Sequence, residues 1–291
     1  MDKREIDQTV NRVIDDYDPA VPAATADCLR DYWLRFEPKS VGGIKAEQRA
    51  RQETVGIPIP ILKEIGKAIS KCARKQVDDF LPLTMLLWDD YGREGRVVSS
   101  VVLGAVASQQ PQTVVPLLKT LCSSCITWED CDRLAMDALE PVVRKKPEIW
   151  LSELGFWLAD DNMWIRRAGV TVAGRLPMKH PGHTRRCLAL VETRLFDPEL
   201  EVKRAVSFAI RISARGSVES VIDFLLGHVP PENPAATWVL CDVIRSMSKK
   251  LLPAFKPVLP QYEAWAAEPG LEVVARRSVA SAVTVLHEAL P

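Results

Sequence analysis

The chain has 291 residues, and its 38 lysines and arginines are balanced by 38 aspartates and glutamates. A net charge of zero excludes a protein that coats nucleic acid through bulk positive charge, although a sum does not report a local basic face. Apolar residues make up 47% and charged residues 26% of the chain, which is typical of a folded globular protein and excludes a disordered one.

The sequence carries no signal for export or for a membrane. The segment Met1–Asp18 is dominated by charged and polar residues and lacks the apolar region of a secretory signal. No run reaches the about 18 apolar residues that a membrane-spanning helix needs. The seven cysteines are scattered and odd in number, which fits buried thiols in a reducing compartment. We therefore expect a cytoplasmic protein with no membrane partner.

The dominant local pattern along the chain is helical. Proline falls just before or within the first turn of many runs, as at Pro82, Pro111 and Pro147, where a missing backbone N–H is tolerated. Convincing alternating strand patterns are absent from the sequence. The runs with the clearest apolar spacing of three and four residues are Val114–Cys122, Trp164–Leu176, Val202–Ser213 and Val218–Gly227.

One segment of the chain repeats. Asp160–Ala168 is echoed 37 residues later by Asp197–Ala205, and Glu268–Val273 begins a third, looser copy. An acidic turn, a basic residue one helical turn later and then small apolar residues are typical of HEAT-like helix pairs. We predict an all-α, curved HEAT-like α-solenoid of about six helix pairs. It would form a single domain over residues 1–291, with less regular helices in residues 1–55.

Charge is unevenly distributed along the chain. Residues 160–215 carry eleven basic and six acidic residues, whereas residues 86–159 carry seven and ten, and residues 216–291 carry six and eight. Arginines that recur once per repeat would fall on the same side of successive helix pairs and form a basic strip. Two interpretations stay open for each arginine: a contact to DNA, or a bridge to an acidic residue of the next repeat.

The strongest candidate for chemistry is the segment Thr127–Arg133. On a helix, Trp128 and Asp132 are four residues apart, so the indole and the carboxylate share one face. An aromatic ring beside a carboxylate suits a flat, cationic substrate. A core tryptophan next to a surface aspartate would give the same pattern. The same TWxxCD spacing returns 110 residues later at Trp238 and Asp242, so at least one copy is expected to be architectural.

Other chemical signals are weak. Cys122 and Cys125 form a lone CxxC, and His180 and His183 form HxxH, but nothing else in the sequence supports a zinc site. No glycine-rich phosphate loop and no GxSxG motif is present. We therefore expect no metal and no cofactor.

The motifs between Trp128 and Leu176 resemble the DNA alkylation repair family, the AlkD-type DNA glycosylases built from HEAT-like repeats. The matching elements are the WxxxD of Trp128 and Asp132, the turn Lys145–Glu148 and the segment Ala159–Ala168. Nearer the N-terminus, Asp31–Leu34 and Gly56–Pro58 are similar to the family's tyrosine-bearing helix and its GVxxP turn.

The resemblance implies excision of cationic N-alkylated purines, such as 3-methyladenine and 7-methylguanine, from duplex DNA in base excision repair. Asp132 would be the catalytic carboxylate that stabilises the positive charge on the deoxyribose and positions water. Trp128 would contact the sugar and backbone at the lesion, Arg167 would hold a phosphate beside it, and Tyr32 would be a further contact. The other DNA contacts that we predict are Arg166, Arg175, Arg204, Phe208 and Arg211. The partner is then duplex DNA with alkylated bases, bound by a monomer.

One residue departs from the family pattern. Where the family places a second tryptophan on the later helix, this chain has Phe208, whose ring attracts cations more weakly than an indole. Two alternative functions therefore stay open. One is a non-catalytic HEAT-repeat protein that binds distorted or branched DNA, and the other is a protein-interaction scaffold.

Overall fold

The computed structural model describes residues 2–37, 54–228 and 234–289, and within these ranges every regular element is helical. These residues form two compact units, Met1–Val142 and Val143–Pro291, which we call unit 1 and unit 2 and describe separately. None of the helices in the described ranges has the length and apolar character needed to cross a bilayer. That the chain forms one domain stays a prediction.

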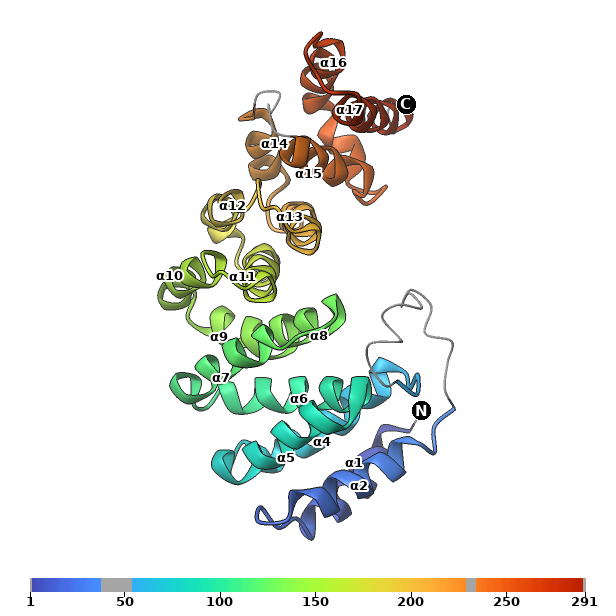
Figure 1. Cartoon of the computed structure of the whole chain (residues 1–291), viewed down its shortest axis with the longest axis vertical. Helices are drawn as coiled ribbons and strands as arrows, with labels where there is room; N and C mark the ends of the chain where they lie inside the picture. The colour runs from blue at the N-terminus through green and yellow to red at the C-terminus, as the bar shows by residue number, and fades with distance from the viewer. Residues whose placement is uncertain (1, 38–53, 229–233, 290–291) are drawn as a thin grey trace. The chain divides into compact units, whose positions relative to one another are not determined.

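Unit 1 is an array of helices in two layers. The helix α6 packs against α4 and α5, α4 packs against α1, and α2 packs against α5 (Figure 1). The stretch from Trp128 to Lys145 is helical throughout, and its middle is a π-helical turn, η1. The elements are α1 (Lys3–Asp15), α2 (Pro22–Trp33), α4 (Ile59–Ala73), α5 (Val77–Asp90), α6 (Gly92–Ala107), α7 (Pro111–Ser123), α8 (Trp128–Arg133), η1 (Leu134–Leu139) and α9 (Glu140–Lys145), within which the unit boundary falls.

Unit 2 is a succession of helix pairs. The second helices of the pairs, α11, α13, α15 and α17, pack one after another, and we call them the inner helices of this unit. Figure 1 shows α10, α12 and α14 together on one side of the row that the inner helices form. The elements are α10 (Pro147–Leu158), α11 (Met163–Arg175), α12 (Thr184–Glu192), α13 (Leu200–Ser213), α14 (Val218–Leu226), α15 (Pro234–Arg245), α16 (Leu259–Ala267), α17 (Val273–Glu288) and the 3₁₀ turns Leu176–Met178, Pro181–His183 and Leu252–Val258.

The predicted all-α array of helix pairs is confirmed. All four runs with the clearest helical spacing are helical over most of their length, as α7, α11, α13 and α14. Pro111 and Pro147 open α7 and α10 as expected. Pro82 differs, because it is the sixth residue of α5 rather than a first-turn residue. There it removes one backbone donor inside the helix.

A buried ion pair joins two inner helix segments of unit 2. The Arg166 guanidinium donates to both carboxylate oxygens of Asp197, at 2.7 Å from Nε and 3.1 Å from Nη2. Its Nη1 donates to the carbonyl oxygens of Asp160 and Asp161 at 3.0 and 2.8 Å. Arg166 is 8% exposed, so its guanidinium bridges repeats within unit 2. A contact between Arg166 and DNA stays a prediction.

Replacing Arg166 with methionine should cost about 3–5 kcal/mol of unfolding free energy, because the Asp197 carboxylate would be left buried without a counter-charge. Urea unfolding followed by circular dichroism measures this. The control is Arg186→Met, which removes an exposed pair with Glu148 and should cost less than about 1 kcal/mol. Equal losses in the two variants would contradict the bridging role.

Candidate functional site

Trp128 and Asp132 lie on one face of α8, as the sequence predicts. Thr127 starts this helix with a reciprocal cap, in which its hydroxyl accepts from the Asp130 backbone N–H at 3.2 Å and the Asp130 carboxylate accepts from the Thr127 N–H at 3.2 Å. Both Trp128 and Asp132 are partly exposed. Part of each side chain therefore lies at the surface of unit 1.

Two arginines of α6 hold the first turn of α8. Arg93 donates to both carboxylate oxygens of Glu129 at 3.0 Å, and Arg96 donates to Asp130 at 2.8 Å. Burial opposes the charge of Arg93, but its hydrogen bonds to Glu129 and the nearby carboxylate of Glu94 outweigh burial and raise the pKa of the guanidinium. Since Glu129 and Asp130 directly follow Trp128, these pairs fix the direction in which the α8 side chains project.

Glu94 anchors the segment that leads into α4. Its carboxylate is 2% exposed and accepts from three consecutive backbone N–H groups, of which Gly56 is the closest at 2.9 Å. Gly56 has a φ of 93°, a conformation that other residues adopt only with strain. The family-like Gly56–Pro58 motif thus forms a turn around a buried carboxylate, and Arg93 also donates to the carbonyl oxygen of Ile57 at 3.3 Å.

The π-helical turn η1 directly follows α8. Asp137 on this turn accepts from Lys63 at 2.7 Å and from Arg133 at 3.4 Å. Here α6 approaches so closely that a Cβ on Gly104 would lie 1.9 Å from the Asp137 carbonyl oxygen. Sequence periodicity did not predict η1 or the role of Asp137, since a π-turn shifts the register by only one residue. Turns of this kind recur at functional sites.

In unit 2, Glu201 lies between two of the predicted DNA contacts. Arg167 donates to the Glu201 carbonyl oxygen at 2.5 Å and to its carboxylate at 3.3 Å, and Arg204 donates to the same carboxylate at 2.8 Å. Arg167 is only 6% exposed, whereas Arg204 is exposed. A phosphate could occupy the place of the Glu201 carboxylate, because both anions offer oxygens to two guanidinium groups.

Phe208 and Arg211 form a stacked pair one turn further along α13. The Arg211 guanidinium lies 5.7 Å from the centre of the partly exposed Phe208 ring, and it donates to the Ser246 carbonyl oxygen at 2.7 Å. Burial lowers the pKa of Arg211. Arg175, at the end of α11, is partly exposed and forms no ion pair with any residue that the structure describes. These three side chains remain candidates for contact with DNA.

Tyr32 is placed differently from the expectation. It is 6% exposed in α2 and packs edge-on against Phe36, with 5.4 Å between ring centres. Burial raises the pKa of its phenol. Tyr32 is therefore a core residue of unit 1, and a contact between Tyr32 and DNA stays a prediction.

The two TWxxCD copies differ in what surrounds the aspartate. Asp242 accepts from the Ser207 hydroxyl at 2.6 Å and from the Ser246 hydroxyl at 3.4 Å, and pairs with Arg245 at 3.5 Å. Both carboxylate oxygens are thus engaged within unit 2. The later copy therefore contributes to packing within unit 2.

The cysteines are mostly buried thiols. A hydrogen bond with Cys131, together with burial, raises the pKa of Cys122 and of Cys125. Burial raises the pKa of Cys187 and of Cys241 to about 12. Across the described ranges, no group of three or more His, Cys, Asp or Glu side chains is arranged to hold a metal ion. The CxxC motif is thus part of the packing around α8.

Comparison with known proteins defines the class. A sequence model described as DNA alkylation repair enzyme matches residues 36–237. The chain belongs to this family, whose description gives it a role in DNA repair.

Solved structures of similar fold include two from Streptococcus mutans. AlkD2 is 14% identical, with a TM-score of 0.55 over 76% of this chain and 99% of that one. The protein smu.31 of strain UA159 is 15% identical, with a TM-score of 0.48 over 65% of this chain and 99% of that one. At these identities the likeness to AlkD2 shows a shared fold. No curated protein sequence matches the chain.

The burial of the thiols is directly testable. In the native protein a disulfide reagent should modify only Cys28, which is exposed, and more slowly Cys72, which is partly buried. All seven thiols should react after unfolding. Absorbance of the released reagent counts them. Fast reaction of more than two thiols in the native state would show that the packing around α8 is open.

Proposed function

We propose that the protein is a DNA glycosylase that removes positively charged N-alkylated purines, of the 3-methyladenine and 7-methylguanine type, from duplex DNA. The observation that carries the proposal is the partly exposed pair of Trp128 and Asp132 on one face of α8, in a chain of the DNA alkylation repair family. Asp132 is the catalytic carboxylate, and Trp128 contacts the sugar and backbone at the lesion. The cytoplasmic location and the monomeric state stay predictions.

The proposed chemistry asks little of the protein beyond one placed carboxylate. An alkylated purine carries a positive charge, so it leaves as a neutral base and needs no general acid. As the N-glycosidic bond breaks, positive charge develops on the sugar, and the Asp132 carboxylate stabilises it. Water then adds to C1′ of the deoxyribose and releases one proton. This reaction needs no metal or cofactor, and it suits bonds that are already weakened by the charge on the base.

The side chains of unit 2 supply the proposed contacts to the DNA backbone. Arg167 and Arg204 surround the Glu201 carboxylate, and Arg175, Phe208 and Arg211 follow along the inner helices. A few placed contacts of this kind agree with the zero net charge, which limits non-specific affinity.

Two observations favour the alternatives. Phe208 in place of a tryptophan favours a non-catalytic protein that binds distorted or branched DNA. The pairing of Arg93, Arg96 and Arg166 with acidic residues of neighbouring helices is what a protein-interaction scaffold would show. Against the scaffold, Arg175 and Arg211 form no ion pair within the described ranges.

The catalytic proposal is tested by base release. Wild-type protein should release 3-methyladenine or 7-methylguanine from methylated duplex DNA, and Asp132→Asn should lower the rate by at least about 100-fold, because an amide does not stabilise the cationic sugar. Chromatography of the free bases measures the rate. Asp242→Asn is the matched control, since it changes the same residue in the second TWxxCD copy and should leave release unchanged. Undiminished release by Asp132→Asn would remove Asp132 from the mechanism.

The salt dependence of binding separates the three functions. If the protein contacts DNA phosphates, the logarithm of its association constant should fall linearly with the logarithm of the salt concentration. We expect a slope of about −2 to −5, because each contacted phosphate contributes about −0.9. Fluorescence anisotropy with a labelled duplex measures this. Salt-sensitive binding without base release would identify the non-catalytic binder, and no affinity at physiological salt would identify the scaffold.

A further inference from the structure

Arg211, which is partly buried, is not paired in the way that the buried arginines are. Arg93, Arg166 and Arg167 each meet a carboxylate that lies 31 to 36 residues further along the chain. At the equivalent distance, 35 residues on, Arg211 meets the backbone carbonyl oxygen of Ser246 instead. Its Nε is buried without a hydrogen-bond partner in the part of the chain that the structure describes. A partly buried guanidinium in this state lacks a counter-ion.

A hollow of about 200 Å³ lies beside Arg211, between the ends of α13 and α15. Arg215, an exposed residue that forms no ion pair within the described ranges, contributes a second guanidinium. Ser246 and Ser248 also line the hollow, where the Ser246 hydroxyl donates to Asp242 at 3.4 Å, and no acidic residue is among the lining residues. The lining residues are Phe208, Arg211, Ile212, Arg215, Ser246, Met247, Ser248 and Leu251.

Burial lowers the pKa of Arg211, and the negative charge of Asp242 offsets part of this effect. This carboxylate already accepts from the Ser207 hydroxyl at 2.6 Å and pairs with Arg245. Because Asp242 shares its single negative charge between Arg245 and Arg211, it does not balance both arginines of the hollow, which stays net positive. Burial without a full counter-charge is also why the pKa of Arg211 is lowered.

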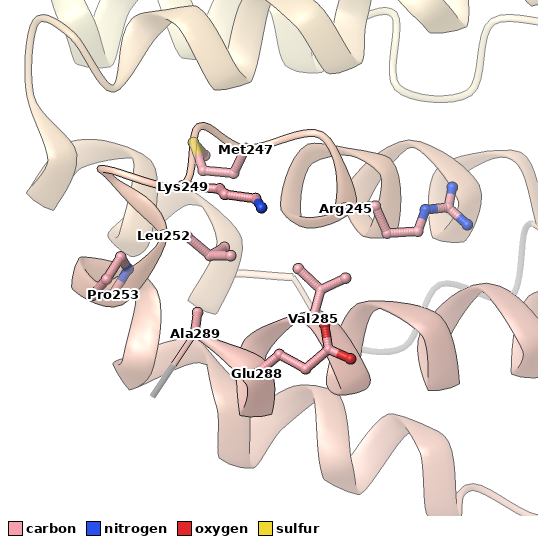
Figure 2. A pocket seen from close by; sticks show the side chains of 8 residues that line it. All are labelled: Arg245, Met247, Lys249, Leu252, Pro253, Val285, Glu288 and Ala289. Atoms are coloured by element: carbon pink, nitrogen blue, oxygen red, sulfur yellow. The ribbon is translucent and has the colours of Figure 1, made fainter. Parts of the chain in front are cut away.

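Met247 also lines a neighbouring hollow of about 430 Å³, whose lining side chains include both cations and an anion (Figure 2). Figure 2 shows Lys249 and Glu288 both among its lining side chains. Its other cation, Arg245, is paired with Asp242. Positive and negative groups balance there, so an anion gains little. Of these two adjoining hollows, the one with Arg211 and Arg215 is the site for an anion.

We propose that the hollow formed by Arg211, Arg215, Ser246 and Ser248 binds a phosphate group, and that its source is the DNA backbone. The two guanidinium groups are donors only, and the Ser248 hydroxyl can donate by rotation. Together they match the several acceptor oxygens of a phosphate. The Phe208 ring supports the Arg211 guanidinium from one face and limits its rotation. This inference rests on the proposed function for its DNA source, whereas the phosphate chemistry stands on the hollow itself.

The test uses the full-length protein with Arg215→Gln, an exposed position where folding should be unaffected. Arg185→Gln is the matched control, because it removes one positive charge from the outer helix α12 and breaks only an exposed pair with Asp223. Duplex affinity should fall about tenfold in Arg215→Gln, which corresponds to one hydrogen-bonded charge contact. The salt slope should become shallower by about 1. The control should retain both values, and thermal melting confirms folding of both variants.

A second arm tells the phosphate sources apart. Inorganic phosphate at constant ionic strength should raise the melting temperature of the wild type more than that of Arg215→Gln. If the wild type binds DNA and Arg215→Gln matches it in affinity and slope, the inference about the hollow is overturned while the proposed function survives. If the wild type binds no DNA but phosphate still stabilises it through Arg215, the DNA source and the proposed function fail, and the phosphate chemistry is upheld.

Discussion

The pairing of arginine with carboxylate across neighbouring helices is the interaction on which both units depend. Arg93 and Arg96 tie α6 to α8 in unit 1, and Arg166 and Arg167 tie α11 to the start of α13 in unit 2. Each pair is buried or nearly so, and a buried charge is tolerated only when its partner is well placed. The spacing of the helices within each unit is therefore constrained by charge as well as by apolar packing. Arg211 and Arg215 lack such a pair within the described ranges, and their charge is left for a ligand.

Much of the fold could be predicted from the sequence, because helical periodicity and the echo of Asp160–Ala168 at Asp197–Ala205 are local properties. The shared face of Trp128 and Asp132 follows from their spacing alone. What each arginine contacts could not be predicted in the same way. Arg166 and Arg211 both lie on inner helices, yet one meets Asp197 and the other meets a carbonyl oxygen. That difference depends on the distance between helices, which a single sequence does not report.

The two TWxxCD copies show how one short motif can serve two purposes. In α15, serine hydroxyls and Arg245 occupy the aspartate, and the motif stabilises the packing of α13 on α15. In α8, the neighbouring Glu129 and Asp130 take up the arginines of α6. Asp132, which follows them on the same helix, is partly exposed. Preorganisation of a single carboxylate is the feature that a reaction with a charged leaving group requires.

The π-helical turn after α8 carries one residue more than an α-helical path between the same ends would need. Loss of any single residue from Leu134–Leu139 would let the segment return to ordinary α geometry without breaking the helix. Because the flanking turns keep their places, Trp128 and Asp132 would keep their direction relative to Glu140, and only the residues of the turn itself would change register. In evolutionary terms, the turn is a one-codon insertion that the helix absorbs locally, beside the indole and the carboxylate rather than at their expense.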